Sequence, residues 1–584
     1  WDEVCANGHS MRDAKWFRGA SLNFAENLLR FKDTKPAIVF VSERGQRESI
    51  SYAQLCDEVS KVASYLKSLG VGVGDKVAAY LPNIPQTVIA MLATASLGAV
   101  WSSCSPDFGL RAVRDRFSQI DPKILFTADG YFYNGKFCDT LQTASQLAKE
   151  ITSIEHTIVI PYASPTPDIS MVRDSLQWAE IQSKSPGEIE FVHLPFDHPL
   201  YILYSSGTTG APKCIVHGAG GTLIQHLKEL VLHCDLKRSD KIMYYTTCGW
   251  MMWNWLVSSL AVGATVLLYD GSPFYPDGKA LFDVAEREKL SVFGTSAKYI
   301  SAVEKAAVRP IESHDLSALR LILSTGSPLL PENFSFVYSS IKRDIHLASI
   351  SGGTDIVSCF ALGNPITPVY SGELQTRGLG MSVEVFNEDG ESVIQECGEL
   401  VCTRPFPSMP IYFLNDPEGE KYHNAYFNVF DGVWRHGDWA EITAHDGVII
   451  YGRSDAVLNP GGVRIGTAEI YQEVEQFLEI LECMAVGQEW EGSERVILFV
   501  KLRPDLVLSD DLRESLKAQI RKNTTPRHVP AKIIQVSDLP KTFNGKIAEL
   551  AVKNVMHGRA VKNLDALSNP EALEVFRNLE ALRT

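Results

Sequence analysis

The sequence predicts an α/β protein with parallel sheets, built from two or three domains. The first observation is a repeated alternation of apolar, β-prone runs with helical segments, at the spacing of βαβ units. The second is the length of 584 residues, which is more than one hydrophobic core usually supports. The composition, with 45% hydrophobic and 21% charged residues, is that of an ordinary globular protein.

The individual elements follow from local periodicity. Residues 52–69 place Leu55, Val59, Val62 and Leu66 on one helical face, and Gly70 ends that helix. Over the first 245 residues the same reasoning predicts helices at 52–69, 85–97 and 222–233, and strands at 37–41, 76–81, 99–103, 124–127, 157–160, 200–204 and 241–245. Toward the C-terminus it predicts an acidic helix with a solvated charged face at 467–481, strands at 496–500 and 533–536, and an amphipathic helix at 570–582.

Charge and cysteine content restrict the partners and the compartment. The 55 Lys and Arg against 70 Asp and Glu give a net charge of −15, which argues against nucleic acid or an anionic membrane as main partner. The 11 cysteines are scattered and lack C-x-x-C pairs, which favours reduced thiols in a cytosolic protein. The apolar stretch 250–268 contains Asn254 and Gly263, so it predicts a buried helix and a strand rather than a membrane span. The sequence begins at Trp1 rather than at methionine, so a preceding targeting segment stays open.

The most informative segment is a strand that runs into a loop of small and hydroxylated residues. The apolar run 200–204 is followed by Ser205-Ser-Gly-Thr-Thr-Gly-Ala-Pro-Lys213. Such a loop can offer several backbone N–H groups and hydroxyls to one anion, and Lys213 adds a charge suited to phosphate. It is not a Walker loop, because Gly207 and Gly210 are three apart and Cys214 follows the lysine. A plain polar hairpin loop is the alternative.

Other segments combine turn-forming residues with functional ones. The run Trp250-Met-Met-Trp-Asn-Trp255 forms a large apolar wall, and a buried helix N-terminus is its plainer interpretation. The turn 324–329 follows the strand predicted at 319–323, a position where parallel sheets bind ligands. The remaining segments are Ala348-Ser-Ile-Ser-Gly-Gly-Thr-Asp-Ile356, the Gly- and Arg-rich stretch 451–470, and Leu539-Pro-Lys-Thr-Phe-Asn-Gly-Lys-Ile547.

Together these segments resemble the adenylate-forming superfamily, which includes acyl-CoA synthetases, luciferases and peptide-synthetase adenylation domains. The resemblance covers nearly the whole chain, and the string 291–300 is similar to the branch that activates acetoacetate. It implies an AMP-forming acid–thiol ligase that joins acetoacetate to coenzyme A through an acyl-adenylate, using ATP and Mg²⁺. It also implies a large N-terminal domain, 1–454, with parallel sheets sandwiched by helices and a β-barrel-like subdomain. A small mobile α+β domain, 455–584, would turn about a hinge at Asp455.

The resemblance also implies residue roles. Lys546 is the expected catalytic lysine, Thr354 would hold the α-phosphate, and Asp355 stands where the family usually has Glu and would help place Mg²⁺. Ser327 stands where acetyl-activating relatives have Glu. The expected ATP and AMP contacts are Ser205, Ser206, Gly207, Thr208, Thr209, Lys213, Gly326, Ser327, Pro328, Ser351, Gly353, Asp438 and Arg453. The expected acyl pocket comprises Trp250, Met251, Met252, Thr325 and Gly352, and the expected CoA contacts are Gly461, Gly462, Arg464 and Arg521.

Gly352 bears on the choice of acid. By resemblance it takes the position of a bulky Trp that closes the pocket in acetyl-activating relatives, so its hydrogen would leave room for a larger acid such as acetoacetate. A glycine that only serves a tight turn is the alternative. A synthetase for acetate, propionate or butyrate stays open at this point, as does a nucleotide- or acyl-binding protein without turnover.

Overall fold

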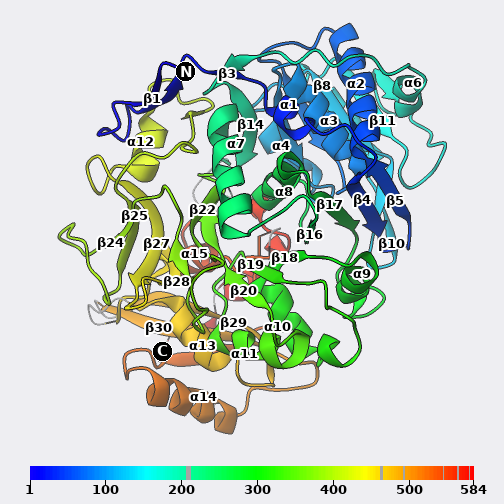
Figure 1. Cartoon of the computed structure of the whole chain (residues 1–584). Coiled ribbons are helices and arrows are strands. Elements are labelled where there is room, and N and C mark those ends of the chain that lie inside the picture. Colours follow the sequence, from blue (N-terminus) through cyan, green and yellow to red (C-terminus); the bar gives the residue numbers. More distant parts are fainter. Residues whose placement is uncertain are drawn as a thin grey trace.

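The computed structural model describes residues 1–205, 212–460, 465–490, 493–542, 545–561, 564–577 and 579–583. Within these residues the chain forms two large sheets with helices against them, a group of antiparallel strands, and a C-terminal α+β domain, coloured orange to red in Figure 1. The predicted α/β class with parallel sheets and a small C-terminal domain is therefore confirmed.

The first large sheet has eight strands, and most of its neighbouring pairs are parallel. In order they are β12 (Ser175–Gln177), β11 (His156–Ile160), β8 (Ile124–Ala128), β6 (Lys76–Tyr80), β7 (Val100–Cys104), β14 (Pro199–Tyr204), β15 (Cys214–Gly218) and β26 (Tyr412–Phe413). Strand β15 runs antiparallel to β14, with Tyr204 opposite Cys214. The loop expected to bind phosphate therefore connects two adjacent strands.

The second large sheet has seven strands and is parallel except at one edge. In order they are β20 (His346–Ser349), β19 (Leu321–Thr325), β18 (Val292–Ser296), β16 (Lys241–Tyr244), β17 (Thr265–Asp270), β4 (Pro36–Ser42) and β5 (Arg47–Ser51). Strand β5 pairs antiparallel with β4.

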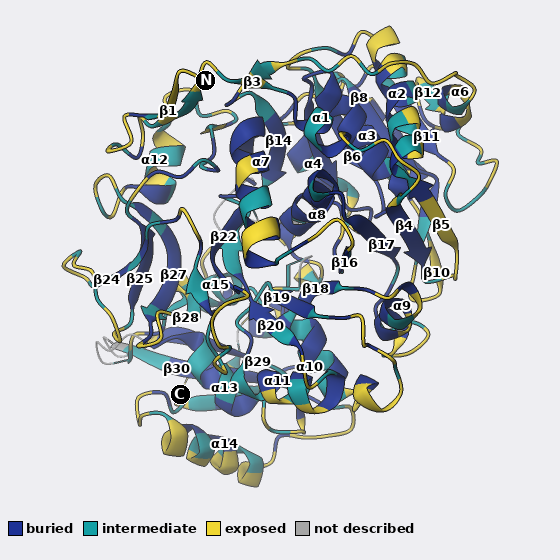
Figure 2. Cartoon of the chain, viewed as in Figure 1, coloured by how far each residue is buried: buried dark blue, intermediate teal, exposed yellow. Residues whose placement is uncertain are grey.

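The main hydrophobic core lies between these two sheets. Helix α3 (Pro85–Ser96) is buried along nearly its whole length and belongs to a cluster that includes residues of both sheets. Helix α2 (Tyr52–Ser68) begins where Ser51 and Gln54 form a reciprocal capping box, and it buries the face predicted from periodicity. Figure 2 shows the buried strands at the centre and the exposed outer face of α14 (Asp510–Asn523).

Antiparallel strands follow the two large sheets. Strands β24 (Val383–Phe386), β25 (Gly398–Cys402), β27 (Trp434–Ile442) and β28 (Val448–Arg453) form one sheet, and β21 (Ser351–Gly353), β22 (Ser358–Leu362) and β23 (Thr376–Arg377) form another. Beyond β28 come α13 (Thr467–Val474), the sheet of β29 (Ile480–Trp490), β30 (Ser493–Leu502) and β31 (Lys532–Gln535), and α15 (Glu549–Met556).

Three local predictions were wrong in part. The acidic helix α13 ends at Val474, and strand β29, which had not been predicted, begins at Ile480. Its acidic face is not solvated throughout, since Glu473 is buried and accepts hydrogen bonds from Gln519 and Asn523 of α14. The tail predicted as one helix forms two short 3-10 turns instead, at Pro570–Phe576 and Glu580–Leu582. Among the described residues, none of the helices combines the length and hydrophobicity needed to span a membrane.

Candidate active site

A cavity of about 450 Å³ lies where strands of both large sheets end and the C-terminal domain faces them. Tyr204, Cys104 and Thr325 are the last residues of β14, β7 and β19, and all three line it. Ligands commonly bind beyond the carboxyl ends of parallel strands. The predicted site residues that line this cavity are Trp250, Met251, Met252, Thr325, Gly326, Ser327, Pro328, Ser351, Gly352, Gly353, Thr354, Asp438, Arg453 and Lys546.

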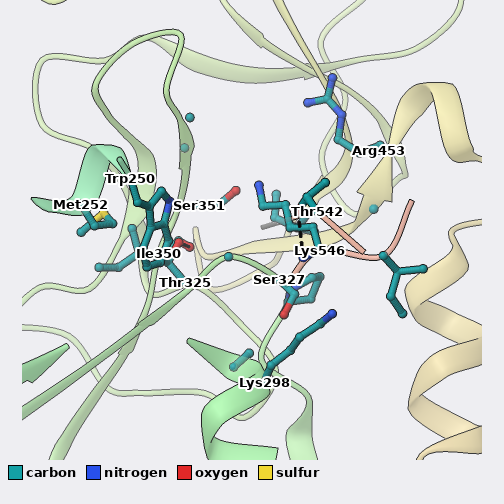
Figure 3. Close-up of a pocket in the computed structure, with 18 of the residues that line it drawn as sticks. Trp250, Met252, Lys298, Thr325, Ser327, Ile350, Ser351, Arg453, Thr542 and Lys546 are labelled. Carbon is teal, nitrogen blue, oxygen red and sulfur yellow. Dashed lines mark hydrogen bonds between the residues drawn. The ribbon is translucent and has the colours of Figure 1, made fainter. Parts of the chain in front are cut away.

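The loop that carries Lys546 is closed by short-range hydrogen bonds. The N–H of Thr542 donates to the carbonyl of Lys546 at 2.8 Å, and the Lys546 N–H donates to Thr542 Oγ1 at 3.1 Å. Gly545 has a φ of 73°, a conformation that glycine adopts without strain. In Figure 3 this loop lies in the middle of the cavity, with Arg453 on one side and Ser327 and Lys298 on the other.

The charge of Lys546 is set by its neighbours. Burial within the surrounding protein lowers the pKa of its ammonium group and the cation of Arg453 lowers it further, while Asp438, Asp355 and Glu549 act in the opposite direction. The side chain is nevertheless exposed to the open space of the cavity, which moderates the shift. The net direction is downward, and the ammonium group is left without a direct carboxylate partner among the described residues.

Arg453 and Asp438 form an ion pair across neighbouring strands. They stand opposite each other in β28 and β27, and Arg453 Nη1 lies 3.1 Å from Asp438 Oδ1. Gly437 makes this approach possible, because a Cβ there would come within 2.6 Å of Arg453 Nη2. The pair thus adds one cation and one carboxylate to the lining of the cavity that Lys546 also lines.

Asp355 lies close to the cavity without lining it. Its Oδ1 accepts a hydrogen bond from Tyr426 at 2.5 Å. Burial favours the neutral carboxyl, but His436, the Tyr426 hydrogen bond, Lys213 and Arg453 outweigh it and lower the pKa of Asp355. The ionised carboxylate can therefore hold a divalent cation.

Several predicted residues fall elsewhere. Ser205 and Lys213 do not line the cavity: Ser205 directly follows β14 and Lys213 directly precedes β15. Within the described part of the chain the buried Ser205 Oγ has no hydrogen-bond partner. Asp455 is exposed just after β28, and Arg521 lies on the exposed helix α14, away from the lining residues. The predicted residues Ser206, Gly207, Thr208, Thr209, Gly461, Gly462 and Arg464 lie outside the described residues.

The apolar end of the cavity lies across from Lys546. Met251 and Met252 begin helix α8 (Met251–Val257), both are buried, and Figure 3 shows Trp250 and Met252 beside Ile350 and Thr325. Gly352 also lines the cavity, and a Cβ there would lie 2.1 Å from the carbonyl oxygen of Ser358. The absence of a side chain at 352 thus also permits the close approach of β21 to β22.

The sequence reasoning missed charged residues at the boundary with the C-terminal domain. Lys298, at the start of α10 (Ala297–Lys305), donates to the carbonyl of Gly545 in the Lys546 loop. Glu475 and Glu549 also line the cavity, and burial raises the pKa of both carboxyl groups. Lys298 lies inside the string 291–300 that carried the resemblance, which was the signal available for it.

Two family models match the chain. One described as "AMP-binding enzyme" matches residues 24–413, and one described as "AMP-binding enzyme C-terminal domain" matches residues 473–546. The two matched ranges fall on either side of the Arg453–Asp438 wall and of the exposed Asp455.

Two curated proteins and one solved structure are similar to this chain over its full length. "Acetoacetyl-coenzyme A synthetase" of Rhizobium meliloti is 56% identical, over 100% of this chain and 90% of that protein. "Acetoacetyl-CoA synthetase" of Mus musculus is 46% identical, over 100% of this chain and 88% of that protein. A solved structure, "Acetoacetyl-CoA Synthetase from Streptomyces lividans", has a TM-score of 0.94 at 44% identity and covers 100% of this chain and 90% of that chain.

Proposed function

This chain belongs to the AMP-binding enzyme family, and we propose that it ligates acetoacetate to coenzyme A at the expense of ATP, releasing AMP and diphosphate. The observation that carries the proposal is the position of Lys546, on a loop of the C-terminal domain inside the cavity walled by Trp250, Gly352 and Arg453. Full-length similarity at 46–56% identity to acetoacetyl-CoA synthetases selects acetoacetate. Acetate, propionate and butyrate are therefore not favoured as the physiological acid.

The first half-reaction is attack of the acid's carboxylate on the α-phosphorus of ATP, which forms the acyl-adenylate and releases diphosphate. Negative charge builds up at the α-phosphate, and fixed cations placed there lower the barrier. Lys546 is suited to this role because it combines a cationic head, access to the cavity and no competing carboxylate contact within the described chain. Thr354, which lines the cavity, would donate its hydroxyl to the same phosphate.

The rest of the nucleotide would lie along the same walls. Asp438 would accept the ribose hydroxyls, Arg453 would contact the phosphate and ribose, and the turn of Gly326, Ser327 and Pro328 would hold adenine. Ser351 and Gly353 would complete the pocket. Ser205 and Lys213 would hold the outer phosphates together with the loop between them.

Asp355 fits Mg²⁺, which proteins usually hold with one or two carboxylates plus substrate phosphates. Its lowered pKa keeps the carboxylate ionised, and Tyr426 orients it. When bound, the ion would neutralise phosphate charge.

In the second half-reaction the thiol of CoA displaces AMP from the acyl-adenylate. For the thiol to reach the acyl-adenylate, Lys546 would leave the cavity that it now lines, which requires the C-terminal domain to turn. We place the boundary between residues 1–454 and 455–584, with the hinge at Asp455, because β28 ends at Arg453 and Asp455 is exposed. Gly461, Gly462, Arg464 and Arg521 are the proposed CoA contacts of the turned state.

A cytosolic location is part of the proposal. It rests on eleven cysteines that are all free thiols, which suits a reducing compartment.

The proposed function is tested by comparing kcat/KM for acetoacetate, acetate, propionate and butyrate, with diphosphate release as the readout of the first half-reaction. Acetoacetate should exceed each of the other acids by about tenfold or more, the usual discrimination for a change of one small group in a pocket. Equal or higher kcat/KM with another acid would overturn the choice of substrate. Absence of diphosphate release with every acid would overturn the ligase itself.

A further inference from the structure

One side of the helix that follows β15 carries buried polar residues. Helix α7 (Ala219–Leu227) continues into a π-helical turn, Lys228–His233. Single π-helical turns often occur at functional sites. The buried polar residues along this side are Gln225, His226, Glu229 and His233, each no more than 3% exposed.

All four anchor the neighbourhood of strand β22. The amide of Gln225 donates to Ser358 Oγ at 2.6 Å, and His226 Nε2 lies 2.7 Å from the carbonyl oxygen of Val357. His233 Nδ1 lies 2.8 Å from the carbonyl oxygen of Gly363. The helix thus holds both ends of β22.

Glu229 is the charged centre of this face. Its Oε1 accepts from Ser358 Oγ at 2.5 Å, from Gln225 Nε2 at 3.0 Å and from the Cys359 N–H at 3.2 Å. Lys228 Nζ lies 3.6 Å from the same oxygen. A fully buried carboxylate with this many donors is an anchor that fixes the position of each donor.

The other oxygen of Glu229 reaches a different wall of the cavity. Oε2 accepts from Trp255 Nε1 at 2.8 Å, and Trp255 lies on helix α8, which begins with Met251 and Met252. The Trp255 ring packs edge-on against Tyr244, and Tyr244 packs edge-on against Trp250. These contacts connect Glu229 to the apolar lining of the cavity.

Glu229 also reaches a second part of the cavity lining, through the strand pair β21–β22. Cys359, whose N–H it accepts, pairs with Gly352, and Ser358 pairs with Gly353. Gly352 and Gly353 line the cavity. One carboxylate therefore connects helix α8 with the strands β21 and β22, and all three elements contribute residues to the cavity lining.

We propose that Glu229 is a positioning residue for acid selectivity, which holds helix α8 and strand β22 at a fixed separation and so sets the width of the acyl end of the cavity. The inference rests on the proposed ligation of a short acid. Glu229 itself touches no substrate, because it is completely buried and is absent from the cavity lining.

This positioning role requires that both side-chain oxygens of Glu229 accept hydrogen bonds, one from Trp255 and the other from Ser358 and Cys359. Burial alone would favour the neutral acid, but Lys228, Ser358, His226 and Gln225 outweigh it and lower the pKa of Glu229. A glutamine of the same shape would have to turn its NH₂ group toward Trp255 Nε1–H or toward the Ser358 and Cys359 donors. Two donors facing each other in a buried site repel, so one wall should move outward.

The test is Glu229→Gln in the full-length enzyme, with kcat/KM measured for acetoacetate and for hexanoate, which is two carbons longer. The acetoacetate-to-hexanoate ratio should fall by about tenfold, the scale of discrimination by a small change in pocket size. The fall should appear mainly as a higher KM for acetoacetate. A ratio equal to that of the wild type would overturn the proposal.

Two further variants separate positioning from general loss of stability. Glu288→Gln is the matched control, because Glu288 is also a buried carboxylate, paired with Arg47 at 2.8 Å and Lys241 at 3.2 Å, and is absent from the cavity lining. It should lower the melting temperature and leave the ratio unchanged. An equal fall of the ratio in Glu288→Gln would show general loosening and overturn the proposal.

Trp255→Phe removes one N–H and keeps most of the ring. Alone it should lower the ratio a few-fold, and the double variant with Glu229→Gln should lose less than the product of the single losses, because both act on one contact. Multiplicative losses would overturn the proposal. If Glu229→Gln fails to fold, an unchanged ratio in Trp255→Phe is by itself enough to overturn the proposal about Glu229.

If the wild type prefers another acid, the proposed substrate is wrong. The role of Glu229 is then tested with that preferred acid and its homologue two carbons longer.

Discussion

Lys546 has to be protonated to stabilise charge at the α-phosphate. Burial and Arg453 bring its pKa below the usual value for lysine, so the ammonium form is lost at a lower pH than for a lysine in water. We therefore expect the rate of diphosphate release to fall as pH rises through this lowered pKa, with the full rate below it. Lys546→Ala should reduce that rate about 100- to 1000-fold, the usual cost of one group that stabilises transition-state charge.

The control for this pH effect is Lys546→Arg, because a guanidinium stays protonated across the accessible range. Its diphosphate release, measured from pH 7 to 10, should be slower at neutral pH and should lack the alkaline decline. An identical alkaline decline in Lys546→Arg would assign the titration to another group.

Which residues gather in the cavity could be predicted from the sequence more readily than what each of them packs against. Lys546, Arg453 and Asp438 were expected together, and the cavity brings them together. The packing of Gly352 against Ser358 could not be foreseen, because it depends on the register of β21 against β22. Glu229 gave no signal either, since a single glutamate in an apolar helix has no distinguishing local pattern.

At the scale of elements, helix α10 is where the large domain holds the lysine loop. Lys298 Nζ donates to the carbonyl of Gly545, and Lys305 Nζ, two turns further on, donates to the carbonyl of Leu481 at 2.7 Å. The proposed rotation of the C-terminal domain would break both contacts, so they belong to the present orientation. Helix α10 should therefore favour the state in which Lys546 is in the cavity.

Lys298→Ala should consequently slow diphosphate release and spare thioester formation from supplied acetoacetyl-adenylate. Loss of one hydrogen bond from a charged donor is worth about 1.5–3 kcal/mol, so a decline of roughly tenfold or more is expected in the first half-reaction. Lys305→Ala should show the same selectivity for the first half-reaction. Equal losses in both half-reactions would mean that these lysines support the fold rather than the orientation.

Several buried strands of the two large sheets were predicted well, because each is a short apolar run that can be recognised from its own residues. The β4, β6, β8 and β11 strands match their expected ranges within one or two residues. The end of the acidic helix was predicted wrongly because the helical spacing of apolar residues after residue 467 continues to Leu481. In the structure, residues from Ile480 onward form a strand that pairs with β30. Burial of Glu473 depends on Gln519 and Asn523, which lie about fifty residues away.

At the scale of the whole molecule, one cavity has to serve two reactions in turn. The acyl end is built by the large domain alone, through α8, β19 and β21, whereas Lys546 comes from the C-terminal domain. A rotation can therefore exchange the catalytic groups while the acyl group and nucleotide stay in place. The domain boundary at residue 455 was predicted from the resemblance, because the Gly- and Arg-rich stretch 451–470 by itself indicates only a loop.

The rotation can be tested at its proposed axis with Asp455→Pro. Residues 454–456 form a 3-10 turn, and proline both fixes its own φ and disfavours a helical conformation at Ser454. The backbone change should restrict the hinge, so one half-reaction should be lost while the other persists near the wild-type rate. Diphosphate release reports the first, and CoA consumption with supplied acetoacetyl-adenylate reports the second. Asp455→Ala, which removes the carboxylate 3.8 Å from Arg453 and leaves the backbone free, should retain both. If Asp455→Pro also retains both half-reactions, the axis lies elsewhere.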